Sequence, residues 1–383
     1  MSATDTGRRR VVGALLAGGC AACLARGALA QDQAAGAPLA SGEGAGLAAS
    51  PARWWKELDQ LRVECNLCPR KCRVADMERG ACGVRENRAG KYVTLVHSRA
   101  CALHLDPVEK KPFYHVLPGA AALSLGVPGC NIECKFCQNW EIAQVRPEQV
   151  RTSSLSPGDL VQLARRHGAP TLAATYTEPV VWAEYVRDIA IAGNKAGLRT
   201  LMISNGFILP EPMNELADVL AAVKVDLKAF SEKFYKEQCR GELKPVLDTL
   251  RLLAKRRMWT EIVVLLIPGL NDGEAEARAL ARFVRDDVGP EVPVHFTRFH
   301  PSYRMMNVPP TPVSSLERAR DAARAEGLKY VYVGNVPGHP GNHTYCPGCG
   351  ATLIRRTGLA VLGNRLQSGK CPDCSRAIPG IWS

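Results

Sequence analysis

The chain reads Cys130-Asn131-Ile132-Glu133-Cys134-Lys135-Phe136-Cys137 directly after an apolar run, residues 121–127, and the breaker pair Pro128-Gly129. Three cysteines with the spacing C-x3-C-x2-C converge from one short loop, which suits an iron-sulfur cluster. A cubane cluster has four irons, so three local thiolates leave one iron open to substrate, as a catalytic zinc site leaves one position open. The alternative is a zinc knuckle or three buried thiols, but structural zinc normally closes its shell with a fourth nearby ligand.

The composition limits the class of protein. The chain has 383 residues, enough for two or three domains, and 46% of them are hydrophobic, which is ample for a sizeable core. After residue 30 there is no apolar stretch of about eighteen residues, so we expect no membrane span in the mature chain. The net charge is +12, but the arginines are scattered and no basic run is interleaved with aromatics. We therefore expect a solvated basic surface and no nucleic-acid partner.

Residues 1–30 are typical of a targeting segment. Arg8-Arg9-Arg10 precede an apolar run over residues 11–24, and Ala28-Leu29-Ala30 forms an A-x-A cleavage pattern. The arginine pair indicates a signal of the twin-arginine type, a route that exports folded proteins. The alternative is a misassigned start codon or a degenerate leader. Residues 31–52 are rich in Ala, Gly and Ser, and this composition predicts a flexible linker.

Fifteen cysteines pose a choice between disulfides and metal sites. Eleven fall into three groups with metal-ligand spacing, and a large α/β enzyme does not need disulfides, so we favour metal. The first group lies in a Cys-rich segment, residues 53–119, and consists of Cys65, Cys68, Cys72 and Cys82. Four thiols close a tetrahedral site, and structural zinc is our first interpretation. A second iron-sulfur cluster for electron relay remains open, because four cysteines satisfy either metal.

A charged connector joins this segment to the cysteine loop. It runs from Asp106 to Gly119 and includes Glu109, Lys110 and Lys111. Charges flanked by prolines usually belong to a solvated connector. Here the stretch leads directly into the first predicted core strand, so we expect these three side chains near the mouth of a barrel.

The barrel is predicted over residues 120–335, where short β-branched runs alternate with amphipathic stretches. One helix start is well marked, with Ser156 as N-cap, Pro157 at the first position and Asp159 at the third. The fold class is α/β, and the length suits a TIM-like partial (β/α)6 barrel of six strands. The strand candidates are residues 122–127, 171–176, 199–204, 222–227, 261–267, 292–298 and 329–333.

Polar residues close several of these strands, and active sites of such barrels gather at the carboxyl ends. The second strand ends in Thr175-Tyr176-Thr177-Glu178-Pro179, where Glu178 either belongs to the site or opens the next helix as a first-turn acid. The third ends in Ser204-Asn205-Gly206. The fourth ends in Val225-Asp226-Leu227-Lys228, and opposite charges at a buried strand end are costly unless they are used or matched.

The sixth strand carries two histidines and an arginine, His295, Arg298 and His300. A lone histidine is more often a core residue than a catalyst, but three such side chains within six residues favour function. Because side chains alternate along a strand, we expect at least one of the two histidines to point into the barrel.

The carboxyl-terminal segment, residues 336–383, contains two C-x2-C pairs. Two such knuckles are typical of a zinc ribbon, and the prolines and glycines beside the cysteines fit tight turns that aim both thiolates at one metal. Redox disulfides and rubredoxin-type iron are the alternatives. The predicted ligands are Cys346, Cys349, Cys371 and Cys374.

The ordered motifs resemble a known family. The cysteine loop with its extension Gln138-Asn139-Trp140-Glu141, the connector, the strand ends above, Ile267-Pro268-Gly269 and Arg298-Phe299-His300-Pro301 together look like the AmmeMemoRadiSam-system radical S-adenosylmethionine (SAM) enzymes. That family is similar in turn to the activating enzymes of pyruvate formate-lyase. The resemblance covers nearly the whole mature chain, although the second strand has Tyr-Thr-Glu where many relatives have Gly-Gly-Glu.

The resemblance implies a radical SAM partial barrel and a set of site residues. Cys130, Cys134 and Cys137 hold a 4Fe-4S cluster whose open iron binds SAM, and the cluster's electron cleaves SAM to methionine and a deoxyadenosyl radical that abstracts hydrogen from a substrate. The residues implied in SAM contact are Glu178, Asn205, Asp226 and Lys228.

The resemblance leaves two functions open, and the cysteine pattern allows a third. The first is hydrogen abstraction from an unidentified substrate, the second is activation of a glycyl-radical enzyme, and the third, from another class, is a non-enzymatic metal-binding scaffold. The implied partners are an electron donor such as flavodoxin or ferredoxin, and a protein partner that is either Memo-like or a glycyl-radical enzyme. The chemistry is cytoplasmic, whereas the leader suggests periplasmic export.

Overall fold

A computed structural model of the chain describes residues 49–383, which belong to one compact unit, Pro38–Ser383. The predicted leader, residues 1–30, and most of the predicted linker lie outside the described residues. Within residues 49–383, no helix is both long enough and apolar enough to cross a membrane.

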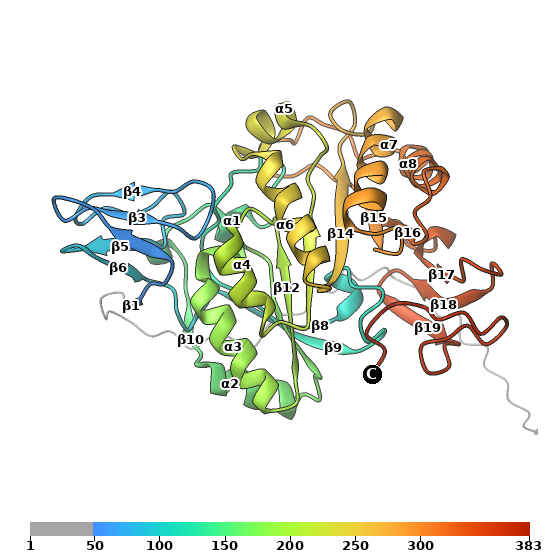
Figure 1. Cartoon of the computed structure of the whole chain (residues 1–383), viewed down its shortest axis with the longest axis horizontal. Helices are drawn as coiled ribbons and strands as arrows, with labels where there is room; N and C mark the ends of the chain where they lie inside the picture. Colours follow the sequence, from blue (N-terminus) through green and yellow to red (C-terminus); the bar gives the residue numbers. More distant parts are fainter. Residues whose placement is uncertain (1–48) are drawn as a thin grey trace, which may run out of the picture. The chain divides into compact units, whose positions relative to one another are not determined.

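An eight-stranded sheet forms the centre of this unit (Figure 1). Seven strands are parallel and follow one another across the sheet in chain order, from β9 to β16, while β8 is added antiparallel to β9 at the edge. The strands are β8 (Ala102–Pro107), β9 (Ala121–Gly126), β11 (Thr171–Ala174), β12 (Arg199–Ser204), β13 (Ala222–Asp226), β14 (Trp259–Leu266), β15 (Val294–Arg298) and β16 (Val331–Gly334).

Amphipathic helices follow the parallel strands and cover one face of the sheet (Figure 1). Crossover helices are required because parallel neighbours cannot be joined by tight turns. Ser156 caps α2 through a reciprocal contact with Asp159, and Pro157 occupies the first position, so the predicted helix start is confirmed. The longer helices are α2 (Pro157–Arg166), α3 (Ala183–Lys195), α4 (Pro210–Ala217), α6 (Leu243–Lys255), α7 (Glu274–Phe283) and α8 (Val313–Ala325); α1 (Trp140–Ala143) and α5 (Glu232–Phe234) are short.

The Cys-rich segment forms two small antiparallel sheets, β2-β3-β4 and β1-β6-β5, and β7 pairs with β10. Its buried residues share one hydrophobic core with the barrel strands. The buried Arg85 also lies 2.9 Å from Glu184 on α3, which ties the segment to the helical layer. Its strands are β2 (Trp55–Glu57), β3 (Val63–Cys65), β4 (Arg73–Val74), β5 (Arg85–Arg88), β6 (Lys91–Thr94) and β7 (Arg99–Ala100), with β10 at Ser153–Ser154. β1 (Ser50–Pro51) lies at the end of the predicted linker, which at these two residues pairs with β6 as a strand.

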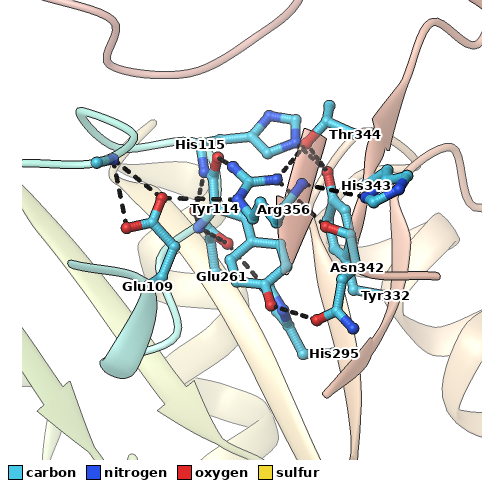
Figure 2. Close-up of polar contacts among 11 residues, drawn as sticks. Glu109, Tyr114, His115, Glu261, His295, Tyr332, Asn342, His343, Thr344 and Arg356 are labelled. Atoms are coloured by element: carbon cyan, nitrogen blue, oxygen red, sulfur yellow. Dashed lines mark hydrogen bonds and ion pairs between the residues drawn. The ribbon is translucent and has the colours of Figure 1, made fainter. Parts of the chain in front are cut away.

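The carboxyl-terminal segment forms an antiparallel sheet of β17 (Thr344–Tyr345), β18 (Thr352–Thr357) and β19 (Ala360–Asn364). Arg356 on β18 is buried and reaches into the central unit. Its guanidinium donates to the Tyr114 carbonyl at 2.8 Å and lies 3.6 Å from Glu109 (Figure 2). Burial raises the pKa of Glu109, and the positive charge of Arg356 opposes that shift. This pair joins the connector to the carboxyl-terminal sheet.

Two expectations about this region were wrong. The sheet has seven parallel strands and not six, because β16 pairs with β15 as one more parallel strand. The beginning of the connector is also part of a strand, since Asp106 and Pro107 end β8 and pair with the first residues of β9. Because β8 runs antiparallel to β9, residues 109–111 follow the end of β8 near the amino ends of the parallel strands, although all three line the same cavity as the cysteine loop.

We predict that Arg356→Met lowers the free energy of unfolding by about 3–5 kcal/mol, because it leaves a buried carboxylate without its cation. Arg355→Met is the matched control, since Arg355 is exposed on the same strand and should change stability by less than about 0.5 kcal/mol. Thermal unfolding of the two variants measures the difference. Adding Glu109→Gln to Arg356→Met should recover part of the loss; equal effects of the two single variants would contradict this account.

Candidate functional site

A cavity of about 630 Å³ lies against the inner face of the sheet. The cysteine loop and the carboxyl ends of β11, β12 and β13 line one end of it. Tyr114 from the connector and Asn342 and Leu359 from the carboxyl-terminal segment line the other end. The cavity therefore extends from the cysteine loop to the carboxyl-terminal segment, and we call the latter end its floor.

The cysteine loop brings Cys130, Cys134 and Cys137 to the wall of this cavity. Backbone contacts hold the loop from outside, because the N–H of Glu133 donates to the Cys239 carbonyl at 2.8 Å. Gly129 begins the loop with φ +101°, and a Cβ there would lie 2.6 Å from Val84. A glycine is required at this position by both its backbone conformation and the close approach.

The environment of the three thiols disfavours free thiolates. Burial raises the pKa of Cys137 to about 11 and that of Cys130 well above its usual value. A contact with the Cys239 thiol, together with burial, raises the pKa of Cys134. A metal bound to these sulfurs would supply the positive charge that thiolates need there.

Cys239 was missed by sequence reasoning, because a single buried cysteine with no partner nearby in the chain carries no spacing signal. It is completely buried beside the loop, in the turn that follows α5.

Three of the four residues expected to contact SAM gather next to the loop. Asn205 lies 3.9 Å from the Cys130 sulfur and donates to the Asn131 side chain at 2.9 Å. Asp226 accepts from Lys228 at 3.0 Å and also from Lys224. All these side chains line the cavity except Asn131.

Lys224 was also missed by sequence reasoning. It lies two residues before Asp226 on β13, and a period of two places both side chains on the same face of the strand. A lysine in the middle of a buried apolar strand was the available signal. Asp226 therefore lies between two cations, which hold its pKa at about 2 despite burial.

Glu178 lines the cavity, but its carboxylate is already engaged. It accepts from the N–H of Val180 at 3.0 Å, from the Ser204 hydroxyl at 2.7 Å and from the N–H of Asn205 at 2.8 Å. It thus caps the short 3-10 helix Pro179–Trp182 and ties two strand ends together. Burial raises its pKa to about 7 in spite of these donors.

The floor of the cavity is polar. Glu261 on β14 accepts from His295 on β15 at 2.7 Å, and it also accepts from the N–H groups of Tyr114 and His115 (Figure 2). Burial lowers the pKa of His295, so this imidazole is neutral near pH 7. His295 lines the cavity, whereas His300 is exposed.

Of the three cysteine groups, only the carboxyl-terminal one is compact enough to hold a single metal ion, among the residues that the structure describes. The sulfurs of Cys346, Cys349, Cys371 and Cys374 all lie within 4.8 Å of one another. Two of the sulfur–sulfur distances are 3.5 and 3.7 Å. This arrangement is consistent with a metal site.

Comparisons with known proteins give the relatives of the chain. Residues 125–281 match the family profile described as the Radical SAM superfamily. The Uncharacterized protein MJ0808 of Methanocaldococcus jannaschii is 40% identical over 329 residues, which are 85% of this chain and 98% of that protein. The pyruvate formate-lyase 1-activating enzyme of Escherichia coli K12 is 24% identical over 218 residues, 53% of this chain and 89% of that enzyme.

A solved structure, that of a radical SAM methyltransferase from Sphaerobacter thermophilus, is 19% identical with a TM-score of 0.44, and the match covers 58% of this chain and 68% of that one.

Glu178 should make stability fall as the pH rises from about 5 to 7.5. Its pKa is higher in the folded chain, about 7, than the ordinary 4.5, so the native state holds a proton that the unfolded state releases. The protonated Glu178 therefore contributes about 3 kcal/mol to the free energy of unfolding below about pH 4.5, and this contribution is lost as the pH approaches 7. Glu178→Gln should remove this part of the slope.

The measurement is the melting temperature of wild type and variant at pH 5.5 and 7.5. Glu211→Gln is the control, because Glu211 is an exposed acid in the first turn of α4. If the melting temperatures of wild type and Glu178→Gln change equally between pH 5.5 and 7.5, the pH dependence does not come from Glu178.

Proposed function

Because the chain belongs to the radical SAM superfamily and is a radical SAM enzyme, we propose that Cys130, Cys134 and Cys137 bind its 4Fe-4S cluster and that the cavity receives SAM and the substrate. A bound cluster supplies the electron that cleaves SAM to methionine and a deoxyadenosyl radical, which abstracts hydrogen from the substrate. The observation that carries this proposal is that all three thiols line one cavity together with Glu178, Asn205, Asp226 and Lys228.

The donor set fits such a cluster. The loop offers three sulfurs, and the neighbouring Cys239 thiol contacts Cys134 but does not line the cavity, so one iron would be left for SAM. Asn205 beside the Cys130 sulfur adds a hydrogen-bond donor of the kind that tunes cluster potentials. Lys228 is close enough to Cys134 to stabilise its thiolate.

The surrounding charges suggest how SAM is oriented. Lys228 would bind the SAM carboxylate, since it lies beside the loop and donates to Asp226 from the cavity wall. Asp226 and Glu178 would accept from the ammonium group. Glu178 has all three of its contacts within the chain, so we expect it mainly to position Asn205 and the strand end.

The substrate is unidentified, and we place it toward the floor of the cavity. The neutral His295 and the cationic Lys224 line that region, so the bound molecule should carry polar or anionic groups. Trapping deuterium transferred from a labelled candidate into deoxyadenosine identifies the hydrogen that is removed.

A second candidate function is activation of a glycyl-radical enzyme. It is favoured by the relatives named activating enzymes, one for pyruvate formate-lyase and one for isethionate sulfite-lyase. This function implies a protein partner, as does assignment to the AmmeMemoRadiSam system with its Memo-like partner. Flavodoxin or ferredoxin would supply the electron in each case. Membership of an enzyme superfamily decides against the non-enzymatic scaffold.

We also propose zinc for the carboxyl-terminal cysteines. Tetrahedral zinc with bonds of about 2.3 Å separates its sulfurs by about 3.8 Å, close to the distances of 3.5 and 3.7 Å. A zinc ribbon there would fix the segment that closes the cavity floor. The boundaries of the segments, at residues 119/120 and 335/336, stay predictions.

Cys134→Ala should reduce deoxyadenosine formation to the background of the metal-free chain, because the cluster loses a ligand. The assay is anaerobic incubation of reconstituted protein with SAM and dithionite, and zinc content should be unchanged. Cys101→Ala is the matched control, since this half-buried thiol lies outside the three groups and donates to the Gly126 carbonyl at 3.5 Å. Cleavage retained by Cys134→Ala would refute the ligand assignment.

A further inference from the structure

We propose that Cys65, Cys68, Cys72 and Cys82 bind a second iron-sulfur cluster of the cubane type, and not zinc, and that it relays single electrons to the cluster at Cys130, Cys134 and Cys137. The relay part rests on the proposed function. An external one-electron donor, such as flavodoxin or dithionite, is oxidised as the second cluster is reduced, and the second cluster is reoxidised as it reduces the first.

The spacing of the sulfurs separates the two metals. A single zinc ion draws its four sulfurs to about 3.8 Å from one another. The carboxyl-terminal group meets this requirement, with its sulfurs within 4.8 Å of one another, whereas the Cys65 group is not among the clusters in residues 49–383 that are gathered closely enough to hold one ion. A cubane places irons and sulfides between its thiolates and so holds them farther apart than one ion does. The Cys130 group, too, is not among the clusters in the described residues that are gathered closely enough for one ion.

The four sulfurs nevertheless share one site. Burial, together with the neighbouring thiols of Cys65, Cys72 and Cys82, raises the pKa of Cys68 to about 12. The N–H of Ala81 donates to Cys72 at 3.4 Å, and the backbone N–H groups of Leu67, Arg70 and Val84 lie near enough to Cys65, Cys68 and Cys82 to oppose the rise of their thiol pKa. Such N–H donors stabilise and tune cluster sulfurs.

Two buried donors lie beside these thiols. The Nε of Arg85 has no hydrogen-bond partner in the described chain, and the Tyr92 hydroxyl has only the neighbouring Cys65 thiol to donate to. Both residues are almost completely buried, at 1% and 2% exposure, and both act on the Cys65 thiol. An unsatisfied buried donor is costly, so a ligand is expected to accept from the Nε of Arg85. The inorganic sulfides of an anionic cluster are acceptors that zinc does not bring.

The site directly abuts the first loop. A Cβ on Gly129, the residue before Cys130, would lie 3.0 Å from the Cys82 carbonyl. From the other side Arg70, between Cys68 and Cys72, donates to the carbonyl of Asn131 and, at 2.7 Å, to that of Arg240. Ligand loops of both sites are therefore in contact, which suits electron transfer between them.

The test is metal and sulfide analysis of the anaerobically reconstituted full chain. We expect about eight irons, about eight sulfides and about one zinc per chain. Cys68→Ala should lose about four irons while keeping its zinc and the SAM-sensitive paramagnetic signal of the first cluster. Cys101→Ala is again the control and should lose no iron. About four irons and two zincs in wild type, with loss of zinc in Cys68→Ala, would overturn the proposal.

A second variant keeps the proposal testable if Cys68→Ala does not fold. Tyr92→Phe removes only a hydroxyl, so iron content should be unchanged, while loss of a donor to the cluster should lower the potential of one of two redox transitions. A single transition, unchanged by Tyr92→Phe, would count against a second cluster.

Two further readouts separate the parts of the proposal. If Cys134→Ala loses no iron but Cys68→Ala does, the proposed function fails while the second cluster stands. For the relay, Cys68→Ala should still cleave SAM when dithionite supplies the electron. With flavodoxin as the donor, it should cleave SAM at least about tenfold more slowly than wild type does. Equal rates with flavodoxin would overturn the relay.

Discussion

The interior of the curved sheet depends on the matching of buried charges. A charge without a counter-charge or hydrogen bonds costs several kcal/mol there, so each one needs a specific partner. Asp226 lies between two lysines, Glu261 binds His295 and two backbone amides, and Arg356 lies against Glu109. These pairs connect strands, connector and carboxyl-terminal sheet, and they leave only part of each polar side chain free for a bound molecule.

Much of the architecture could be predicted because it is local in the sequence. β-branched runs define the parallel strands, and Ser156 with Pro157 defines the start of α2. β8 was missed because its end is polar and proline-containing, and such a stretch forms a strand only through pairing with β9. The contact of Arg356 with Glu109 joins residues far apart in the chain, so no spacing pattern could reveal it.

The candidate site, too, was predictable only where its residues belong to a local sequence pattern. Residues that close strands, such as Asn205 and Asp226, were found because parallel strands bring their carboxyl ends together. Lys224 and Cys239 lie within an apolar strand and a helical turn, where a single polar or thiol side chain is usually structural. Glu178 caps a helix and also lines the cavity, so a structural role does not exclude a role in the site.

The three cysteine groups show why spacing along the chain does not by itself identify a metal. C-x2-C occurs in all three, but only the carboxyl-terminal group closes to the distances of one ion. The Cys130 loop lies between the Cys-rich segment on one side and the cavity on the other. If electrons enter through the former and substrate through the latter, neither route crosses the other. Gly129 then has two roles, because it allows the loop to turn and brings Cys82 close to Cys130.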